Sequence, residues 1–280
     1  MNSFCADNYY ICMDMIGIFD SGVGGLSVFR EIRKLLPEEK YIYFSDNAYC
    51  PYGEKSREQI TERARKITDF MLSKGADIIV VACNTATAAA IKTLREEYSK
   101  QNSHVRELTD GKMDRVSFIG MEPAVKPAAA ITKTGTIGVL ATAGTLKADK
   151  YRDTKGRHAE DVTVVEHIGK GFVELVESGN TTGPKAESTV MESIEPLLDA
   201  GADTIVLGCT HYPFLKETIE KVASQLTPER HIFIIDPAPA VAKHLIDIMT
   251  AENIIKREGF SLSLHASGDD SVLVKMSENL

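Results

Sequence analysis

The chain has 280 residues, of which 43% are hydrophobic, so it can bury one large core or two of ordinary size. Its formal net charge of −8, without any tract of Lys and Arg, excludes a nucleic-acid-binding or anionic-membrane surface, because both need clustered positive charge. No apolar run reaches membrane-spanning length, and residues 1–15 have neither the basic start nor the apolar centre of a signal peptide. We therefore expect a cytoplasmic protein whose partner is a small-molecule substrate, with no nucleic acid and no membrane among its partners.

Short apolar runs alternate with helix-like segments from residue 15 onward. The first run, 15–19, predicts a buried strand, and the apolar spacing within 25–36 predicts a helix that stops before a proline. A second strand at 41–44, a helix at about 57–73 and a third strand at 77–83 follow. Because the strands are continuously apolar and alternate with helices, we expect an α/β fold built on a parallel sheet. Ligands of such sheets bind at the carboxyl ends of the strands.

The same pattern starts again after a charge-rich segment at 100–115. The stretch TIGVLATAGTL, from Thr136, resembles MIGIFDSGVGGL, from Met15. The stretch GADTIVLGCTH, from Gly201, matches GADIIVVACNT, from Gly75, at six of eleven positions without a gap. A gapless internal match of this kind is typical of two copies of one structural unit. We therefore predict two similar lobes, each a parallel sheet flanked by helices, with the active site in the cleft between them.

The repeat makes Cys83 and Cys209 a matched pair, each at the end of a predicted strand. The chain has five cysteines, an odd number at wide spacing that fits no disulfide framework, so we expect reduced thiols. One thiolate and one thiol on opposite sides of a carbon atom could remove a proton and return another from the far side, which inverts a stereocentre. The alternative is that both are small core residues. The repeat and the polar residues beside the two cysteines favour the acid–base pair.

Polar residues follow both cysteines and the first strand. They are Asn84 and Thr85 after Cys83, Thr210 and His211 after Cys209, and Asp20 and Ser21 after the strand at 15–19. Hydroxyl and amide groups at a helix start can hold an anion, so these residues are candidate ligands for a substrate carboxylate. His211 could also tune the nearby thiol, and Asp20 could orient Cys83 or hold a substrate ammonium group. The alternative for each of them is ordinary helix capping or structural hydrogen bonding.

Two other ligand classes compete with this interpretation. Residues 22–27 approximate a dinucleotide-binding GxGxxG motif, with Asp46 at the distance of a ribose-binding acid. The third glycine is missing, and Asp20 would place a negative charge beside the pyrophosphate, so dinucleotide binding is disfavoured. A zinc site could draw on Cys50, Cys83, Cys209 and His211. These residues lack the paired spacing of structural zinc sites, and we therefore expect no metal and no cofactor.

Six sequence blocks identify a known family. They are IGIFDSGVGGL, PYGEKS, ACNTATA, EPAVKPA, IGVLATAGTL and GCTHYPFL, in this order over about 16–215. Together they resemble glutamate racemase, of the cofactor-independent aspartate/glutamate racemase superfamily. The resemblance implies that Cys83 and Cys209 are the catalytic acid and base. It implies substrate contacts by Asp20, Ser21, Tyr52, Gly53, Asn84, Thr85, Thr210 and His211.

The resemblance further implies the reaction and the lobe boundaries. The reaction is interconversion of L- and D-glutamate, with D-glutamate supplied to peptidoglycan synthesis and hence to cell shape. We expect residues 15–115 and about 216–280 to form the first lobe, with HIFIID near Asp236 rejoining it. Residues 116–215 would form the second lobe, and residues 1–14 a flexible extension.

The resemblance leaves several features open. Residues 100–115 look like an insertion, and Glu177 lies at an acidic position of a segment, EHIGKGFVELVESG, that departs from the family pattern and is given no role. Aspartate racemase is the nearest alternative activity, because one methylene group is worth only about 1–3 kcal/mol of discrimination. A dinucleotide- or metal-binding protein without racemase activity is the alternative of a different class. A homodimer is compatible with the sequence.

Overall fold

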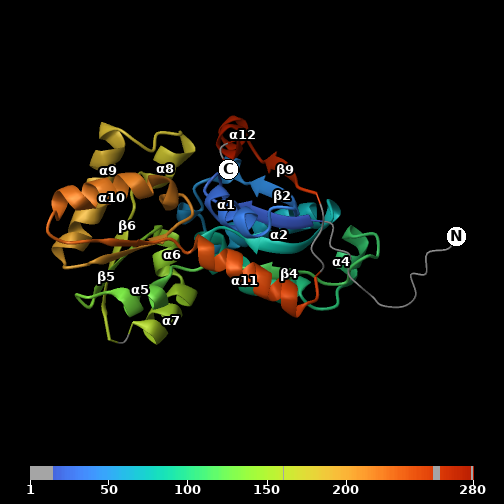
Figure 1. Ribbon diagram of the computed structural model, residues 1–280. Coiled ribbons are helices and arrows are strands. Elements are labelled where there is room, and N and C mark those ends of the chain that lie inside the picture. The colour runs from blue at the N-terminus through green and yellow to red at the C-terminus, as the bar shows by residue number, and fades with distance from the viewer. Residues whose placement is uncertain (1–14, 160, 255–258, 279) are drawn as a thin grey trace.

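Two parallel β-sheets, each flanked by helices, bring the predicted strand ends together (Figure 1). The computed structural model describes residues 15–280 apart from 160, 255–258 and 279, so the predicted flexible extension, residues 1–14, lies outside the described residues. The first sheet has the strand order β4-β3-β1-β2-β9, with every neighbouring pair parallel. Its strands are β1 (Met15–Asp20), β2 (Lys40–Ser45), β3 (Ala76–Val81), β4 (Ser117–Ile119) and β9 (Ser261–Ala266).

Helices cover the first sheet on both faces. The pair α1 (Leu26–Leu35) and α11 (Ala238–Ala251) packs on one face, and the pair α2 (Arg57–Ser73) and α3 (Asn84–Tyr98) packs on the other. Ile16 and Ile18 of β1 join the core beneath α1, whereas Phe19 joins the core beneath α2 and α3. Successive strand side chains point to opposite faces, so a strand covered on both faces must be apolar throughout. The smaller elements of this lobe are the 3₁₀ turns η1 (Asn47–Tyr49) and η2 (Tyr52–Glu54) and the helices α4 (Ser103–Leu108) and α12 (Ser271–Ser277).

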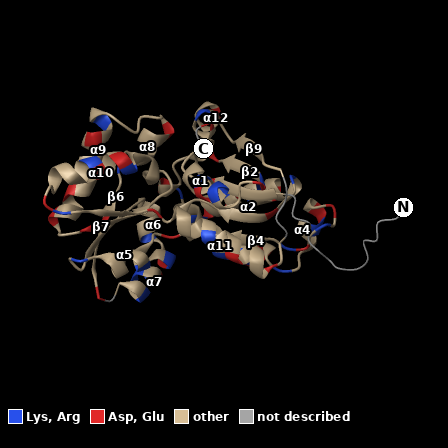
Figure 2. Cartoon of the chain, in the orientation of Figure 1, with Lys and Arg blue, Asp and Glu red and all other residues tan. Residues whose placement is uncertain are grey.

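The second sheet is also parallel and has the strand order β6-β5-β7-β8. Its strands are β5 (Thr136–Ala141), β6 (Thr163–Ile168), β7 (Thr204–Gly208) and β8 (Phe233–Ile235). The helices around it are α5 (Val125–Ile131), α6 (Ala143–Lys147), α7 (Asp149–His158), α8 (Phe172–Glu177), α9 (Pro184–Asp199) and α10 (Lys216–Leu226), together with the turn η3 (Tyr212–Leu215). Charged residues lie mainly on the helices and loops, and the strands carry few of them (Figure 2).

The internal repeat appears in the strand register of both sheets. In the first sheet β1 lies beside β3, with Gly17 opposite Ile79. In the second sheet β5 lies beside β7, with Gly138 opposite Ile205. These are the pairs that the sequence repeat makes equivalent, so the prediction of two similar α/β units is confirmed. None of the helices in the described ranges is long and apolar enough to span a bilayer.

The predicted lobe boundaries are wrong at two points. Strand β4 lies beyond residue 116, yet Phe118 pairs with Ile79 and completes the first sheet. Strand β8, within the HIFIID stretch near Asp236, pairs with β7 rather than rejoining the first lobe, and α10 packs against α9. The chain therefore returns to the first sheet only with α11 and β9. Both strands that were assigned to the wrong lobe are three-residue edge strands. Such short apolar runs do not indicate which sheet they join.

Asp203 anchors the start of β7 to the loop before β5. One carboxylate oxygen accepts the backbone N–H groups of Lys133 at 2.6 Å and Thr134 at 2.9 Å, and the other accepts the hydroxyls of Thr132 at 2.6 Å and Thr204 at 3.0 Å. Burial alone would raise the pKa of Asp203, but these hydrogen bonds outweigh it and hold the pKa below its usual value.

Replacing Asp203 with asparagine should therefore lower the free energy of unfolding by about 1–3 kcal/mol at pH 7, because an uncharged amide accepts weaker hydrogen bonds than a carboxylate and its NH₂ end accepts none. Since the pKa of the folded state is depressed, this contribution is present at neutral pH and is lost as the pH falls through that pKa. Urea denaturation at pH 7 and under acidic conditions measures both effects. Asp199→Asn, at an exposed position in the last turn of α9, serves as the control, and an equal loss there would contradict the prediction.

Candidate active site

The carboxyl ends of β1, β3 and β7 meet where the two sheets face each other. Asp20 ends β1, Cys83 follows β3, and Cys209 follows β7, and all three are buried. The two lobes are joined there by hydrogen bonds: Thr210 donates to both carboxylate oxygens of Asp20 at 3.4 Å, and Ser27 donates to the Thr210 carbonyl at 3.0 Å. The structure thus brings together the predicted site residues from both halves of the repeat.

Cys83 lies at the N-terminus of α3 in an environment that favours the neutral thiol. Its sulfur accepts the Ala86 N–H at 3.4 Å and lies 3.8 Å from the Ser21 hydroxyl. Burial raises the pKa of the Cys83 thiol well above its usual value, and the nearby negative charge of Asp20 raises it further. Asp20 itself accepts the Gly25 N–H at 2.8 Å, while its burial raises the pKa of this carboxyl. A neutral thiol at Cys83 can donate a proton.

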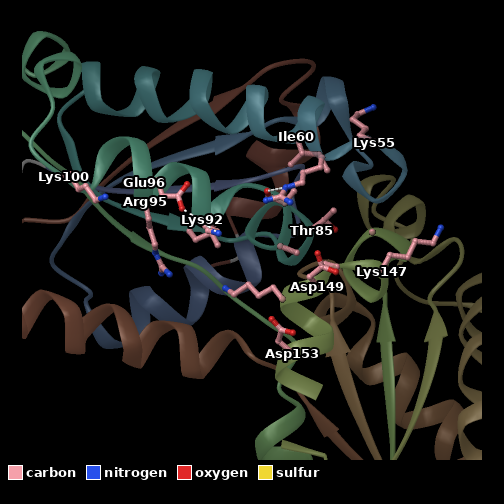
Figure 3. A pocket seen from close by; sticks show the side chains of 17 residues that line it. Lys55, Ile60, Thr85, Lys92, Arg95, Glu96, Lys100, Lys147, Asp149 and Asp153 are labelled. Atoms are coloured by element: carbon pink, nitrogen blue, oxygen red, sulfur yellow. Dashed lines mark hydrogen bonds and ion pairs between the residues drawn. The ribbon is translucent and has the colours of Figure 1, made fainter. Parts of the chain in front are cut away.

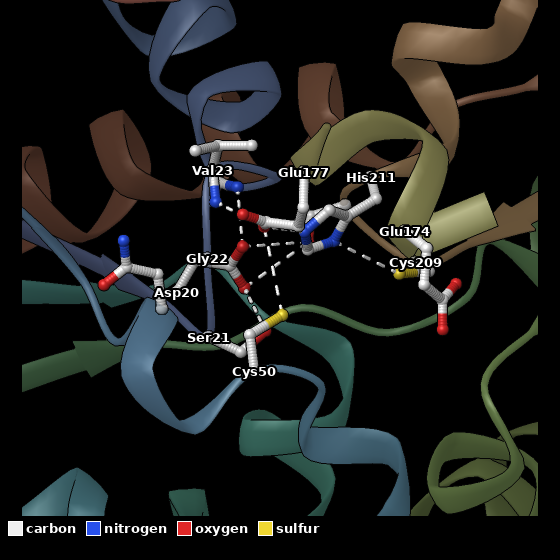
Figure 4. A network of polar contacts seen from close by, with 12 residues as sticks. Asp20, Ser21, Gly22, Val23, Cys50, Glu174, Glu177, Cys209 and His211 are labelled. Atoms are coloured by element: carbon white, nitrogen blue, oxygen red, sulfur yellow. Dashed lines mark hydrogen bonds and ion pairs between the residues drawn. The ribbon is translucent and has the colours of Figure 1, made fainter. Parts of the chain in front are cut away.

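Cys209 has a different partner, a chain of polar groups through His211 to Glu177 (Figure 4). The Cys209 sulfur lies 3.7 Å from Nδ1 of His211, and Nε2 of the same ring lies 2.6 Å from Oε1 of Glu177. Burial lowers the pKa of His211, but hydrogen bonds with Cys209, Cys50 and Glu177 outweigh it and raise this pKa well above its usual value. Cys209 therefore has an imidazole as its neighbour, whereas Cys83 lies near the carboxylate of Asp20.

Asn84 is buried with both polar atoms of its side-chain amide lacking a hydrogen-bond partner among the described residues. A buried amide without partners is costly, so such a group in a functional cleft points to a ligand that satisfies it. Beside it, the Thr85 hydroxyl lies 2.9 Å from that of Thr142 and 3.3 Å from that of Thr145, which belong to the second lobe. Thr142 corresponds to Ser21 in the repeat, and this equivalence is the sequence signal that could have added it to the site.

Comparison with known proteins agrees with this geometry. A sequence model of the family described as Asp/Glu/Hydantoin racemase matches residues 16–245. A glutamate racemase from Stutzerimonas stutzeri is 43% identical over 265 residues, which covers 95% of this chain and 93% of that protein. The chain belongs to the glutamate racemase family. It is therefore an amino-acid racemase, an isomerase.

Solved structures of glutamate racemases share the fold of this racemase. The glutamate racemase isoform RacE1 from Bacillus anthracis superimposes with a TM-score of 0.79 at 30% identity, covering 95% of this chain and 93% of that one. Escherichia coli glutamate racemase, in complex with L-glutamate and the activator UDP-MurNAc-ala, gives a TM-score of 0.76 at 31% identity, covering 95% and 94%. The predicted α/β class, with two parallel sheets, is confirmed by these neighbours.

Tyr52 and Gly53 lie in the turn η2, at the edge of the racemase site. The buried Tyr52 hydroxyl donates to Asp46, which also holds Arg63 through contacts of 2.6 and 3.0 Å. Asp46 is thus engaged within the first lobe, which argues further against a ribose-binding role. Gly53 packs directly on Thr142 across the lobe interface, where a Cβ atom would lie 3.0 Å from the Thr142 Cβ. Substrate contact by Tyr52 and Gly53 stays a prediction.

A cavity of about 840 Å³ opens between α3 of the first lobe and α6 and α7 of the second (Figure 3). Seven basic side chains line it, namely Lys55, Arg57, Lys92, Arg95, Lys100, Lys147 and Lys150. They outnumber the acidic Glu96, Asp149 and Asp153. Thr85 forms part of the wall, which places the cavity next to the catalytic region. Neither thiol lines it, and sequence patterns did not indicate it because its basic residues come from both lobes.

Proposed function

We propose that this racemase interconverts L- and D-glutamate by a two-base mechanism in which Cys83 and Cys209 act from opposite sides of the α carbon. The observation that carries the proposal is the contrast between the two thiols. Cys83 is held neutral by burial and by Asp20, whereas Cys209 lies beside the His211–Glu177 pair. One thiol and one thiolate are the forms needed to deliver one proton and accept another.

In this mechanism a thiolate takes the α proton, and the opposite thiol gives its proton to the other face of the carbon. One proton leaves the substrate and one enters it, so the product is the other enantiomer and the two sulfurs have exchanged protonation states. Negative charge develops on the substrate carboxylate during the transfer and needs hydrogen-bond donors held in place. The unpartnered amide of Asn84 and the hydroxyl of Thr85 supply such donors. The carboxylate of Asp20 can balance the charge of the substrate ammonium group. The ring of His211 can balance the charge of the thiolate.

The product has a use that the resemblance suggests. D-Glutamate would enter peptidoglycan synthesis, which determines cell-wall formation and cell shape, and the enzyme would act in the cytoplasm. Glutamate is preferred over aspartate as substrate because a glutamate racemase is 43% identical over 95% of this chain.

Incubation of L-glutamate with the pure protein in heavy water, without added cofactor, tests the proposal. We expect optical rotation to decay to zero while deuterium appears at the α carbon, as followed by NMR. The absence of exchange, or a requirement for nucleotide or zinc, would refute the proposed chemistry. A parallel reaction with L-aspartate decides between the two substrates.

Asn84→Ala should weaken substrate binding and catalysis without lowering the stability of the fold. Loss of hydrogen bonds to a charged carboxylate should reduce kcat/KM by about 10–100-fold. The free energy of unfolding should stay the same or rise, because the substitution removes a buried amide without partners. Steady-state kinetics and urea denaturation measure the two effects, with the exposed Asn180→Ala as control. A drop in stability with unchanged kinetics would make Asn84 a structural residue instead.

We also propose that the basic cavity binds an anionic effector. The excess of positive side chains would attract an anion. Because Thr85 forms part of the wall, the bound anion would lie next to the proposed catalytic residues. The Escherichia coli relative was solved with the activator UDP-MurNAc-ala, which carries phosphates of the required charge.

Racemase activity with and without this nucleotide sugar tests the effector proposal. We expect a response in the wild type that Arg95→Ala weakens and that Lys66→Ala, on the exposed face of α2, leaves unchanged. A response that is equal in all three proteins, or absent from the wild type, would overturn it.

A further inference from the structure

We propose that Cys50, Glu177 and His211 form a binding site for Zn²⁺ and that occupation of this site inhibits the racemase. The inhibitory effect rests on the proposed function, whereas the binding itself does not. The site differs from the zinc set considered from the sequence, because neither Cys83 nor Cys209 is one of its ligands.

The three side chains come from separate parts of the chain and converge at one point (Figure 4). Cys50 lies between η1 and η2 of the first lobe, Glu177 ends α8, and His211 follows β7. One donor atom from each lies within 4.8 Å of the other two. Oε1 of Glu177 is 2.6 Å from Nε2 of His211 and 3.9 Å from the Cys50 sulfur. A metal ion placed among them would link the two lobes.

Thiolate, imidazole and carboxylate are the three side-chain ligands that zinc uses, and three protein ligands with an open fourth position are common in its sites. Tetrahedral zinc holds such donors about 3.3–3.7 Å apart, given bonds of about 2.0–2.3 Å. The sulfur–carboxylate separation is already close to this range, so the main change needed is a retreat of Glu177 from His211 by less than about 1 Å. Oε1 of Glu177 also accepts the Val23 N–H at 2.8 Å, so this retreat exchanges that hydrogen bond for a bond to the metal. The Glu177 side chain is 22% exposed, whereas the His211 side chain is 2% exposed and stays in place.

Metal at this point would act on the catalytic thiol indirectly. It would take Nε2 of His211, the nitrogen that now contacts Glu177, while Nδ1 still faces the Cys209 sulfur. Bound metal would tie the Cys50 loop of the first lobe to His211 and Glu177 of the second, beside the cleft in which Cys83 and Cys209 are buried. The lobes could then no longer separate to admit a substrate to these thiols. Cys50 is not one of the two acid–base thiols, and in Cys50→Ser a hydroxyl remains beside Glu177, so the variant can test the site while racemisation stays measurable.

The binding test uses Co²⁺ as a spectroscopic substitute for Zn²⁺. Metal-free wild-type protein titrated with Co²⁺ should develop a near-ultraviolet thiolate-to-cobalt charge-transfer band and the intense visible bands of four-coordinate cobalt, and Zn²⁺ should remove both. Glu174→Gln, one turn before Glu177 and exposed, should give the same spectrum. Cys50→Ser should lose the charge-transfer band. If Cys50→Ser keeps the band, the metal binds a different thiol and the proposed site is wrong.

The activity test measures glutamate racemisation against Zn²⁺ concentration. We expect chelator-reversible inhibition of the wild type, and at least about 10-fold weaker inhibition of Cys50→Ser, each measured against the same protein's own rate without metal. Equal inhibition of both proteins would overturn the inhibitory role. If the wild type does not racemise glutamate at all, the proposed function fails, and the cobalt titration still decides whether the metal site exists.

Discussion

Replacing either Cys83 or Cys209 with serine is expected to lower kcat for glutamate racemisation by about 10²–10⁴-fold, because a serine hydroxyl is a far weaker acid than a thiol and cannot exchange protons with the α carbon at neutral pH. KM should change little, since serine has nearly the same shape as cysteine and the carboxylate donors are untouched. Circular dichroism assays started from each enantiomer measure both constants.

The two variants should also differ from each other in heavy water. Each retains one thiol and therefore one face of the substrate, so each should exchange the α proton of one enantiomer without inverting it. The variants should choose opposite enantiomers. Cys50→Ser is the matched control and should lose far less activity than either of the other two variants. Full turnover by either single variant, or exchange of the same enantiomer by both, would contradict the two-base mechanism.

Much of the fold was predictable because buried parallel strands carry two strong signals. Their central residues form continuous apolar runs, as in β1 and β3, and in this chain the pattern occurs twice. The repeat in the amino-acid sequence is enough to assign Cys83 and Cys209 to equivalent strand ends. The register of Gly17 with Ile79 and of Gly138 with Ile205 repeats this equivalence in three dimensions.

The lobe boundaries were not predictable in the same way. Strands β4 and β8 are only three residues long, and an apolar triplet can extend the edge of either sheet. Their partners are chosen by tertiary packing: α4 packs against α2 ahead of β4, and α10 packs against α9 ahead of β8. Neither contact leaves a periodic pattern in the strand that it positions.

The site was predicted only in part, for a similar reason. Asp20, Cys83 and Cys209 follow strands, and strand ends are where parallel sheets place ligands. Glu177 lies at the end of the short helix α8, 34 residues from the His211 that it contacts. Its segment departs from the family pattern, so only the folded chain shows that it holds the imidazole beside Cys209. The contact between Thr85 and Thr145 and the basic cavity likewise involve residues of both lobes.

Gly24→Ala is expected to lower kcat by about 10²-fold, the cost of moving a catalytic group by about 1 Å. A Cβ atom at Gly24 would lie 2.4 Å from Nδ1 of His211 and 2.7 Å from Cε1, which is too close for the ring to keep its position. The ring is held by Glu177 on its far side, so relief of the clash must move Nδ1 relative to the Cys209 sulfur. Steady-state kinetics at 25 °C, with circular dichroism to establish that the variant is folded, measure the loss.

Two comparisons assign that loss to His211 rather than to a general defect. Gly156→Ala, in the last turn of α7 with no atom within 4 Å of the new Cβ, should leave kcat unchanged and stabilise the helix slightly. In a double-mutant cycle, Gly24→Ala should add little to the loss caused by His211→Asn, because the shorter side chain no longer meets the new methyl group. Additive losses would mean that Gly24 acts on catalysis through another contact, and the imidazole would then not be the group that positions Cys209.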